Sequence, residues 1–377
     1  MSDFGRLLKY EYLKVFRRKI VWIMLALMVV LGIFFVYIST IGEEVAPSGV
    51  LAEIHQEKQE GMAISGKKID EALLENYSSV EELPDSLYYT MSAAGTFVFD
   101  DDLEQKPSAE KFYKRRETRI FEDNESYLTE GERQYWEKEE ESLSKPFVFE
   151  YNEAGKVIAA MFYTMMILQI LFTAASIPAI FSDEHMRKMS QINFCCKNGR
   201  KKLYLAKITV GFTVNAGAFL FTFLTWALTA LALFGFHGMG ACVQLIYPNC
   251  SYHLTIGQFL GIQLGVALAM TVLCSAAAMF FAEILRSGVA TMAILLGGML
   301  LSGMLNIPEQ TFRVLGQIWD SFSINFVAVW GILDSRLVPI AGKYFMQYQI
   351  VPAVWLALSA LLTILGYLRY RRYQVTK

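Results

Sequence analysis

Long apolar segments, separated by polar ones, are the main pattern of this chain. About 20 apolar residues in a helix cross the hydrocarbon layer of a bilayer, where the backbone must satisfy its own hydrogen bonds. From Ile208 to Ala282 there is no Asp, Glu, Lys or Arg, a run too long for a soluble domain. We therefore expect an all-α polytopic membrane protein with six transmembrane helices. Their expected ranges are 20–41, 156–181, 204–235, 256–284, 287–306 and 349–369.

The segments between these spans have patterns of their own. In residues 1–19 an apolar stripe through Phe4, Leu8 and Tyr12 lies beside basic residues, which predicts an amphipathic helix at the cytoplasmic membrane surface. Ser321 to Leu333 is apolar for only about thirteen residues, which predicts a re-entrant helical pair before span six. The other segments are expected to be an extracellular domain at 42–155, a cytoplasmic coupling loop at 182–203, an external loop at 236–255, an external re-entrant segment at 307–348 and a cytoplasmic tail at 370–377.

Charge is strongly segregated along the chain, although the net charge is only −2. Residues 41–150 hold 27 acidic and 12 basic side chains, a net of −15, whereas the other 267 residues hold 9 acidic and 22 basic ones. Lysines and arginines gather before span one, after span two, between spans four and five, and after span six. Because cytoplasmic loops carry the excess of Lys and Arg, we expect a multi-pass plasma-membrane protein with both termini cytoplasmic. The segregation also argues against nucleic-acid binding.

The acidic region and the external loop carry further local signals. Aromatic residues are frequent between spans one and two, which predicts a small, mostly helical external domain rather than a disordered linker. Thr129-x-x-Glu132 is a capping-box pattern at the start of one of its helices. Cys242 and Cys250 fall in one predicted external loop, so they could pair as a disulfide or remain two buried thiols.

The loop after span two carries the most specific pattern. Glu184 follows the span, a short predicted helix comes next, Gly199-Arg200 forms a turn, and Lys207 opens span three. This order and spacing resembles the first cytoplasmic loop of ABC-2 type transporter permeases, the membrane subunits of ATP-binding-cassette exporters. The chain departs from the family pattern in lacking the Gly-Thr pair after the acidic residue and the proline before the glycine.

This resemblance implies that residues 186–196 form a coupling helix that docks on a separate ATPase. The residues expected to serve this coupling are Glu184, Met189, Ile192, Phe194, Gly199, Arg200 and Lys207. No G-x-x-x-x-G-K-[ST] phosphate loop occurs in the chain. We therefore expect no enzymatic activity and no bound cofactor here, with ATP and magnesium on the partner. The alternative to this coupling role is that the loop binds no partner and is basic only because it faces the cytoplasm.

The family also implies a dimer, with either a second copy or a homologous permease. Its interface would involve spans one and five, and span five carries small residues that permit close helix contact at Gly297, Gly298 and Ser302. The partners expected overall are a cytoplasmic ABC ATPase subunit, a second permease and membrane lipid.

Uncharged polar residues within the spans are the candidates for a transport pathway. Tyr163, Gln169 and Asn215 are the residues we select, although hydrogen bonding between helices is the alternative role for such groups. Charged residues occur only at span ends, as at Lys207, where the side chain can snorkel to the membrane surface. No His or Cys spacing predicts a metal site.

Two functions of different classes fit this sequence. The first is the permease subunit of an exporter that moves a peptide, drug or lipid-like substrate outward. The alternative is a non-transporting membrane sensor or scaffold whose external domain binds a peptide or a cell-wall component. An ion-coupled carrier is disfavoured because no carboxylate lies deep within a span.

Overall fold

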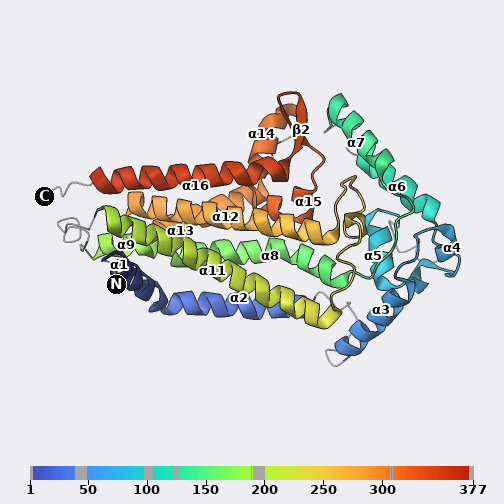
Figure 1. Cartoon of the computed structure of the whole chain (residues 1–377), viewed down its shortest axis with the longest axis horizontal. Helices are drawn as coiled ribbons and strands as arrows, with labels where there is room; N and C mark the ends of the chain where they lie inside the picture. Colours follow the sequence, from blue (N-terminus) through green and yellow to red (C-terminus); the bar gives the residue numbers. More distant parts are fainter. Residues whose placement is uncertain are drawn as a thin grey trace.

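The structure is a computed structural model that describes residues 3–38, 49–96, 105–122, 128–187, 189, 200–305, 307 and 309–372. Its framework is a bundle of long, nearly parallel helices (Figure 1). Among the described residues, five helical segments are long and apolar enough to cross a membrane, which indicates a membrane protein. They are α2 (Lys19–Ile38), α8 (Glu153–Ser176) with its continuation α9 (Ala179–Met186), α11 (Lys201–Phe234), α12 (Ile256–Leu285) and α16 (Gln347–Arg372).

The expected fifth span corresponds to a shorter helix, α13 (Gly288–Met304), of 17 residues. At 1.5 Å per residue it is about 25 Å long, somewhat less than a hydrocarbon layer of about 30 Å. The sixth crossing therefore stays a prediction. The expected second span also differs, because the structure divides it at Pro178, which lacks the backbone N–H that a continuous helix would use, and resumes as α9 up to Met186.

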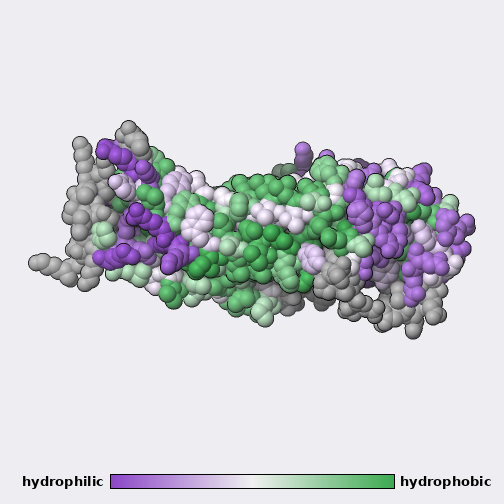
Figure 2. Space-filling view, turned by 90° about the horizontal axis from the view of Figure 1, so that it is seen from below, coloured by the Kyte–Doolittle hydropathy of each residue, from purple (hydrophilic) through white to green (hydrophobic). Residues whose placement is uncertain are grey.

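The bundle is built around α8, which packs against α2, α11, α12 and α13 (Figure 1). Its side chains are mostly buried, whereas the outer helices expose large apolar residues. Examples are Trp22, Ile23, Val30 and Phe34 on α2, Leu300 and Leu301 on α13, and Leu356 and Ile364 on α16. Figure 2 shows the result as a broad apolar belt between two hydrophilic ends. Exposed apolar side chains over such a belt are what a bilayer stabilises and water does not.

The two chain ends lie at one end of this bundle, and the region between α2 and α8 lies at the other (Figure 1). We call these the terminal end and the insert end. The terminal end also holds α1 (Asp3–Phe16) and α9.

The described part of the insert is mostly helical. It contains α3 (Val50–Ile64), α4 (Glu71–Leu74), η1 (Val80–Glu82), α5 (Asp85–Ala93), α6 (Ala109–Phe121) and α7 (Glu130–Ser142). A small core holds α3 to α6 together, with Leu74, Leu87, Met91 and Phe112 fully buried, whereas Trp136 of α7 belongs to the core of the bundle. The predicted cap of α7 is present, since the Thr129 N–H donates to Glu132 at 2.8 Å. This folded core needs no lipid, because the helices bury their apolar faces against one another.

Residues 307–348 differ from the expected helical pair. They contain α14 (Glu309–Phe322), η4 (Ile324–Val327) and α15 (Val329–Ile332), followed by an antiparallel hairpin of β1 (Leu337–Ile340) and β2 (Lys343–Met346). Ala341 and Gly342 both have positive φ, 50° and 78°, as the tight turn of a two-residue hairpin requires. The chain is mostly helical, as expected, and the hairpin is an addition that the sequence analysis did not predict.

The insert packs on this segment through α7. Glu132 is buried and binds the Arg313 guanidinium at 2.6 Å, and it also accepts the Leu337 N–H at 2.8 Å. The Trp136 indole N–H donates to the Ser335 carbonyl at 2.6 Å. Burial raises the pKa of the Glu132 carboxyl, but hydrogen bonds from Arg313 and Thr129 outweigh it, so the net pKa is below its usual value. Glu132 is thus charged and paired, and it ties the insert to the hairpin.

The loop between α11 and α12 completes the insert end, with η3 (Val243–Leu245) at its centre. Cys242 and Cys250 are free thiols in this structure, so the disulfide considered from the sequence is not formed. The Cys250 thiol donates instead to the Tyr247 carbonyl at 3.1 Å.

Candidate functional site

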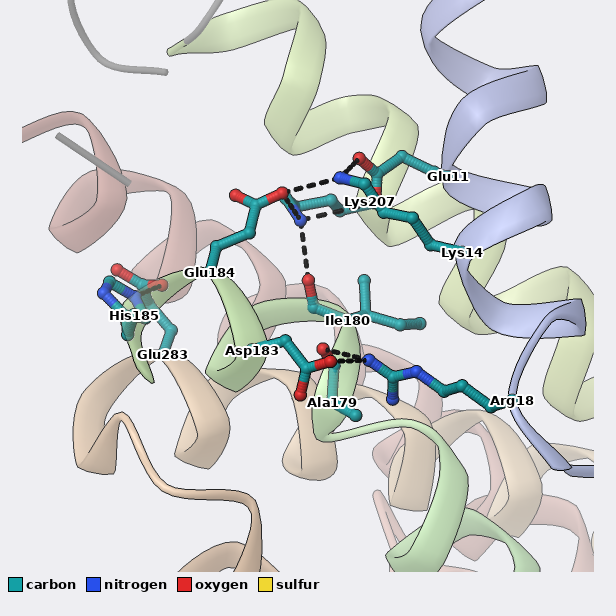
Figure 3. A network of polar contacts seen from close by, with 10 residues as sticks. All are labelled: Glu11, Lys14, Arg18, Ala179, Ile180, Asp183, Glu184, His185, Lys207 and Glu283. Carbon is teal, nitrogen blue, oxygen red and sulfur yellow. Dashed lines mark hydrogen bonds and ion pairs between the residues drawn. The ribbon is translucent and has the colours of Figure 1, made fainter. Parts of the chain in front are cut away.

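The polar cluster of the terminal end is the candidate site, and Lys207 lies at its centre. Lys207 is fully buried in the first turns of α11. Its Nζ lies 2.9 Å from Glu184 Oε1 on α9 and 3.4 Å from Glu11 Oε2 on α1, and it donates to the Ile180 carbonyl at 2.6 Å (Figure 3). The expected snorkelling does not occur, because these partners satisfy the ammonium inside the protein.

A second lysine closes the cluster from α1. Lys14 Nζ lies 2.6 Å from Glu11 and 2.8 Å from Glu184 (Figure 3). Burial lowers the pKa of Lys14, but the two carboxylates outweigh this effect and raise the net pKa above its usual value. Two lysines and two glutamates thus form a compact group without net charge. Such a group is stable while complete, since a buried charge left unpaired costs several kcal/mol.

The residues on either side of Glu184 also bind distant elements. Asp183 pairs with Arg18, at the junction of α1 and α2, and the Arg18 guanidinium donates to the Ala179 carbonyl at 3.0 Å. His185 Nε2 lies 2.9 Å from Glu283 Oε2, close to the end of α12, and both side chains are buried (Figure 3). Three consecutive side chains of α9 therefore contact three different parts of the bundle. This is possible because successive helical residues point in directions about 100° apart.

The structure brings together only some of the residues expected to couple to an ATPase. Glu184 and Lys207 are in contact, as described. Met189 is 48% exposed, and the Arg200 guanidinium donates to the Arg371 carbonyl at the end of α16, at 3.2 Å. The remaining three, Ile192, Phe194 and Gly199, lie outside the described residues. The coupling role stays a prediction for all seven.

Sequence reasoning missed six side chains of the site, which are Glu11, Lys14, Arg18, Asp183, His185 and Glu283. A signal for Glu11 was available, because it occupies the same stripe of α1 as Leu8 and Val15 and so had to be buried with them. A buried acid requires a buried base, and Lys207 is the nearby span-end lysine of α11.

The residues selected for a pathway occupy two different places. Gln169 and Asn215 are buried between α8, α11 and α12, where the Gln169 amide donates to Asn215 Oδ1 at 3.0 Å and the Asn215 amide donates to Ser275 Oγ at 2.6 Å. Tyr163 is half-buried on α8 and its ring contacts the exposed Trp330, with centroids 5.8 Å apart. The first two geometries match the alternative role as helix-to-helix hydrogen bonds, while Tyr163 lies at the surface of the bundle.

The small residues of α13 lie on an open face. Gly298 is exposed, Gly297 and Ser302 are half-buried, and a Cβ added at either glycine would meet no atom within 4 Å. The face thus has room for another helix, as the expected dimer contact requires.

No model of a known protein family, no curated protein and no solved structure matches this chain. The resemblance to ABC-2 type permeases therefore rests on the sequence features alone.

Proposed function

We propose that this chain is the permease subunit of an ATP-driven exporter and that a separate ATPase binds the loop between α9 and α11. The observation that carries the proposal is the position of α9. It immediately precedes that loop, and Asp183, Glu184 and His185 connect it to α1, α11 and α12. A force applied to the loop would reach three elements through one short helix.

The ion pairs of the cluster favour a movement of α1, α9 and the start of α11 together over a movement of one of these helices alone. Pulling α9 away from α11 would leave Lys207 or Glu184 buried without its main partner, at a cost of about 3–5 kcal/mol. Moving α1, α9 and the start of α11 together keeps every pair intact. Arg18 would extend this movement to α2, because it binds Asp183 immediately before α2 begins. On this proposal the ATPase shifts the terminal ends of several spans as a unit.

The open face of α13 would meet a second permease, through Gly297, Gly298 and Ser302. Substrate would then cross between the two copies and pass near Tyr163 and Trp330. A peptide, drug or lipid-like molecule suits a pathway lined by apolar and aromatic groups better than an ion does. ATP and magnesium would be bound by the partner ATPase alone.

The test is purification of the tagged full chain from its native membrane in mild detergent. We expect an ATP-binding subunit to accompany it, and to be lost when Phe194→Ala and Arg200→Glu are introduced together. His253→Ala, at the insert end, is the matched control and should retain the subunit. Recovery of the intact chain with no ATP-binding subunit would refute the exporter proposal.

The sensor or scaffold function remains the second candidate, and the packing of the insert favours it. α7 binds the segment before α16 through Glu132 and Arg313, so a ligand that moved the insert would also move this segment. In that case the terminal cluster would receive a signal from the insert instead of sending one to it.

A further inference from the structure

A cleft lies where the insert meets the loop before α12. It has a volume of about 420 Å³ and is lined by residues of two segments, 142–150 and 240–258. Ligand pockets typically have volumes of about 300–1,000 Å³. The cleft is thus large enough for a few residues of a peptide, and it is separate from the terminal cluster.

One wall of the cleft is an extended segment with a free edge. Residues 147–149 pair with 66–69 on one side only, where the Phe149 N–H donates to the Lys67 carbonyl and the Ile69 N–H to the Phe147 carbonyl, both at 2.8 Å. Val148 stands opposite Lys68 between these two bonds. In such a pair the residue's own N–H and C=O point away from the partner strand.

Those backbone groups of Val148 have no hydrogen-bond partner among the described residues. The cleft is lined by Val148 but by no residue of 66–69, so it lies along the unpaired edge. An unpaired edge of this kind is a template for another strand.

The opposite wall is held together by hydrogen bonds within its own backbone. The Val243 N–H donates to the Leu254 carbonyl and the Ile256 N–H to the Ala241 carbonyl, both at 2.9 Å, which fixes this wall against the start of α12. Gln244 is almost fully buried, and its Oε1 has no hydrogen-bond partner in the described part of the chain. Its amide N–H groups donate to the Cys250 and Tyr252 carbonyls at 3.4 and 2.8 Å, which holds this wall in place.

The lining selects against an acidic ligand. The lining includes the carboxyl group of Glu150 and the imidazole of His253, and His253 lies 3.4 Å from the Glu139 carboxylate. The surrounding region has a net charge of −15. Apolar side chains such as Leu143 and Leu254 line the same cleft. A neutral or cationic ligand with small apolar groups is therefore the best match.

We propose that this cleft binds an extended peptide, which adds as a strand to the free edge at Val148. The backbone N–H and C=O groups of an extended peptide can pair with the free C=O and N–H of Val148, as in any antiparallel strand pair. Pockets for the peptide's side chains then provide selectivity. The proposal is independent of export, because the site would serve a sensor or an exporter equally.

The probe is the fluorescein-labelled heptapeptide Lys-Val-Thr-Val-Thr-Val-Lys, and its binding to the purified full chain in detergent is measured by fluorescence polarisation. Its control is the same peptide with N-methyl groups on the central amides, which cannot form strand hydrogen bonds. We expect saturable binding of the first and at least about tenfold weaker binding of the second. Equal binding of the two peptides, or no binding of either, would overturn the proposal.

Two variants place the binding in this cleft. Val148→Pro removes the free N–H, whereas its control Val148→Thr keeps the N–H and the β-branched shape. Gly240→Leu adds a side chain to the lining of the cleft, at a position where a Cβ would meet no atom within 4 Å. We expect Val148→Pro and Gly240→Leu to weaken binding about tenfold and Val148→Thr to retain it. If Val148→Pro fails to fold, Gly240→Leu decides alone, and unchanged binding by it would reject the site.

Discussion

Replacing Lys207 with methionine tests the terminal cluster most directly. Methionine has a similar length and no charge, so the change removes the ammonium while filling most of its space. The side chain is fully buried and binds Glu184, Glu11 and the Ile180 carbonyl. Its loss leaves two buried carboxylates with only Lys14 between them. We expect the free energy of unfolding to fall by about 3–5 kcal/mol, the cost of an uncompensated buried charge.

A double variant separates this electrostatic effect from a simple packing defect. Lys207→Met combined with Glu184→Gln removes one charge of each sign, and the Glu11–Lys14 pair at 2.6 Å remains neutral by itself. The double variant should therefore be more stable than Lys207→Met alone, although it has lost more polar groups. Additive losses would show that the two residues act independently.

The assay is thermal unfolding of the detergent-purified chain, followed by size-exclusion chromatography after heating. Lys202→Met is the matched control, because Lys202 lies on the same helix and is exposed. It should unfold at the temperature of the unmodified chain, whereas Lys207→Met should unfold several degrees lower. A Lys207→Met protein as stable as this control would refute the argument that the cluster depends on paired buried charges.

Two further predictions concern other parts of the molecule. Gly32→Ala should destabilise the chain by about 1–3 kcal/mol, because a Cβ there would lie 1.5 Å from the buried Trp226 indole. Gly217→Ala is the control in the same thermal assay, because the space around Gly217 is open. Equal melting temperatures of the two variants would contradict the close contact between Gly32 and Trp226. Burial, with nearby carboxylates, raises the pKa of Glu57 to about 7. The folded state thus holds more protons than the unfolded state, so this group lowers stability as pH rises from its unfolded pKa toward 7. Glu57→Gln should stabilise the chain at pH 8 and not at pH 4, and a gain of the same size at both pH values would reject this assignment.

The sequence was sufficient to predict the long apolar helices, because the bilayer imposes their length and composition. In a bilayer the backbone N–H and C=O groups of a segment must be hydrogen-bonded within the protein, which favours a helix. A long apolar run therefore predicts a span almost without reference to the rest of the chain. The cap of α7 was also predictable, because Thr129 and Glu132 are only three residues apart. These features depend on local spacing.

The parts that could not be predicted depend on contacts between distant residues. Lys207 and Glu11 are 196 positions apart, and the hydrophobic periodicity of their two helices does not show that these side chains form an ion pair. The hairpin at Leu337–Met346 is a different case, because its strands are only four residues each and read equally well as short helical runs. Its turn signal is a single glycine after Ala341, which is weaker than the Asn-Gly or Asp-Gly pair that marks most such turns.

The ion clusters at the two ends of the bundle constrain how either candidate function would work. At the terminal end α9 is fixed to α1, α11 and α12, and at the insert end α7 is fixed to the segment before α16 through Glu132. α12 packs extensively on α16, so one route of direct helix packing joins both clusters. An exporter would use this route from the ATPase loop toward the insert, and a sensor would use it in reverse. Because coupling free energies are reciprocal, breaking Glu132–Arg313 should alter the response at the terminal end in either case. Only the site where energy enters distinguishes the two functions, which is why a bound ATPase is the decisive observation.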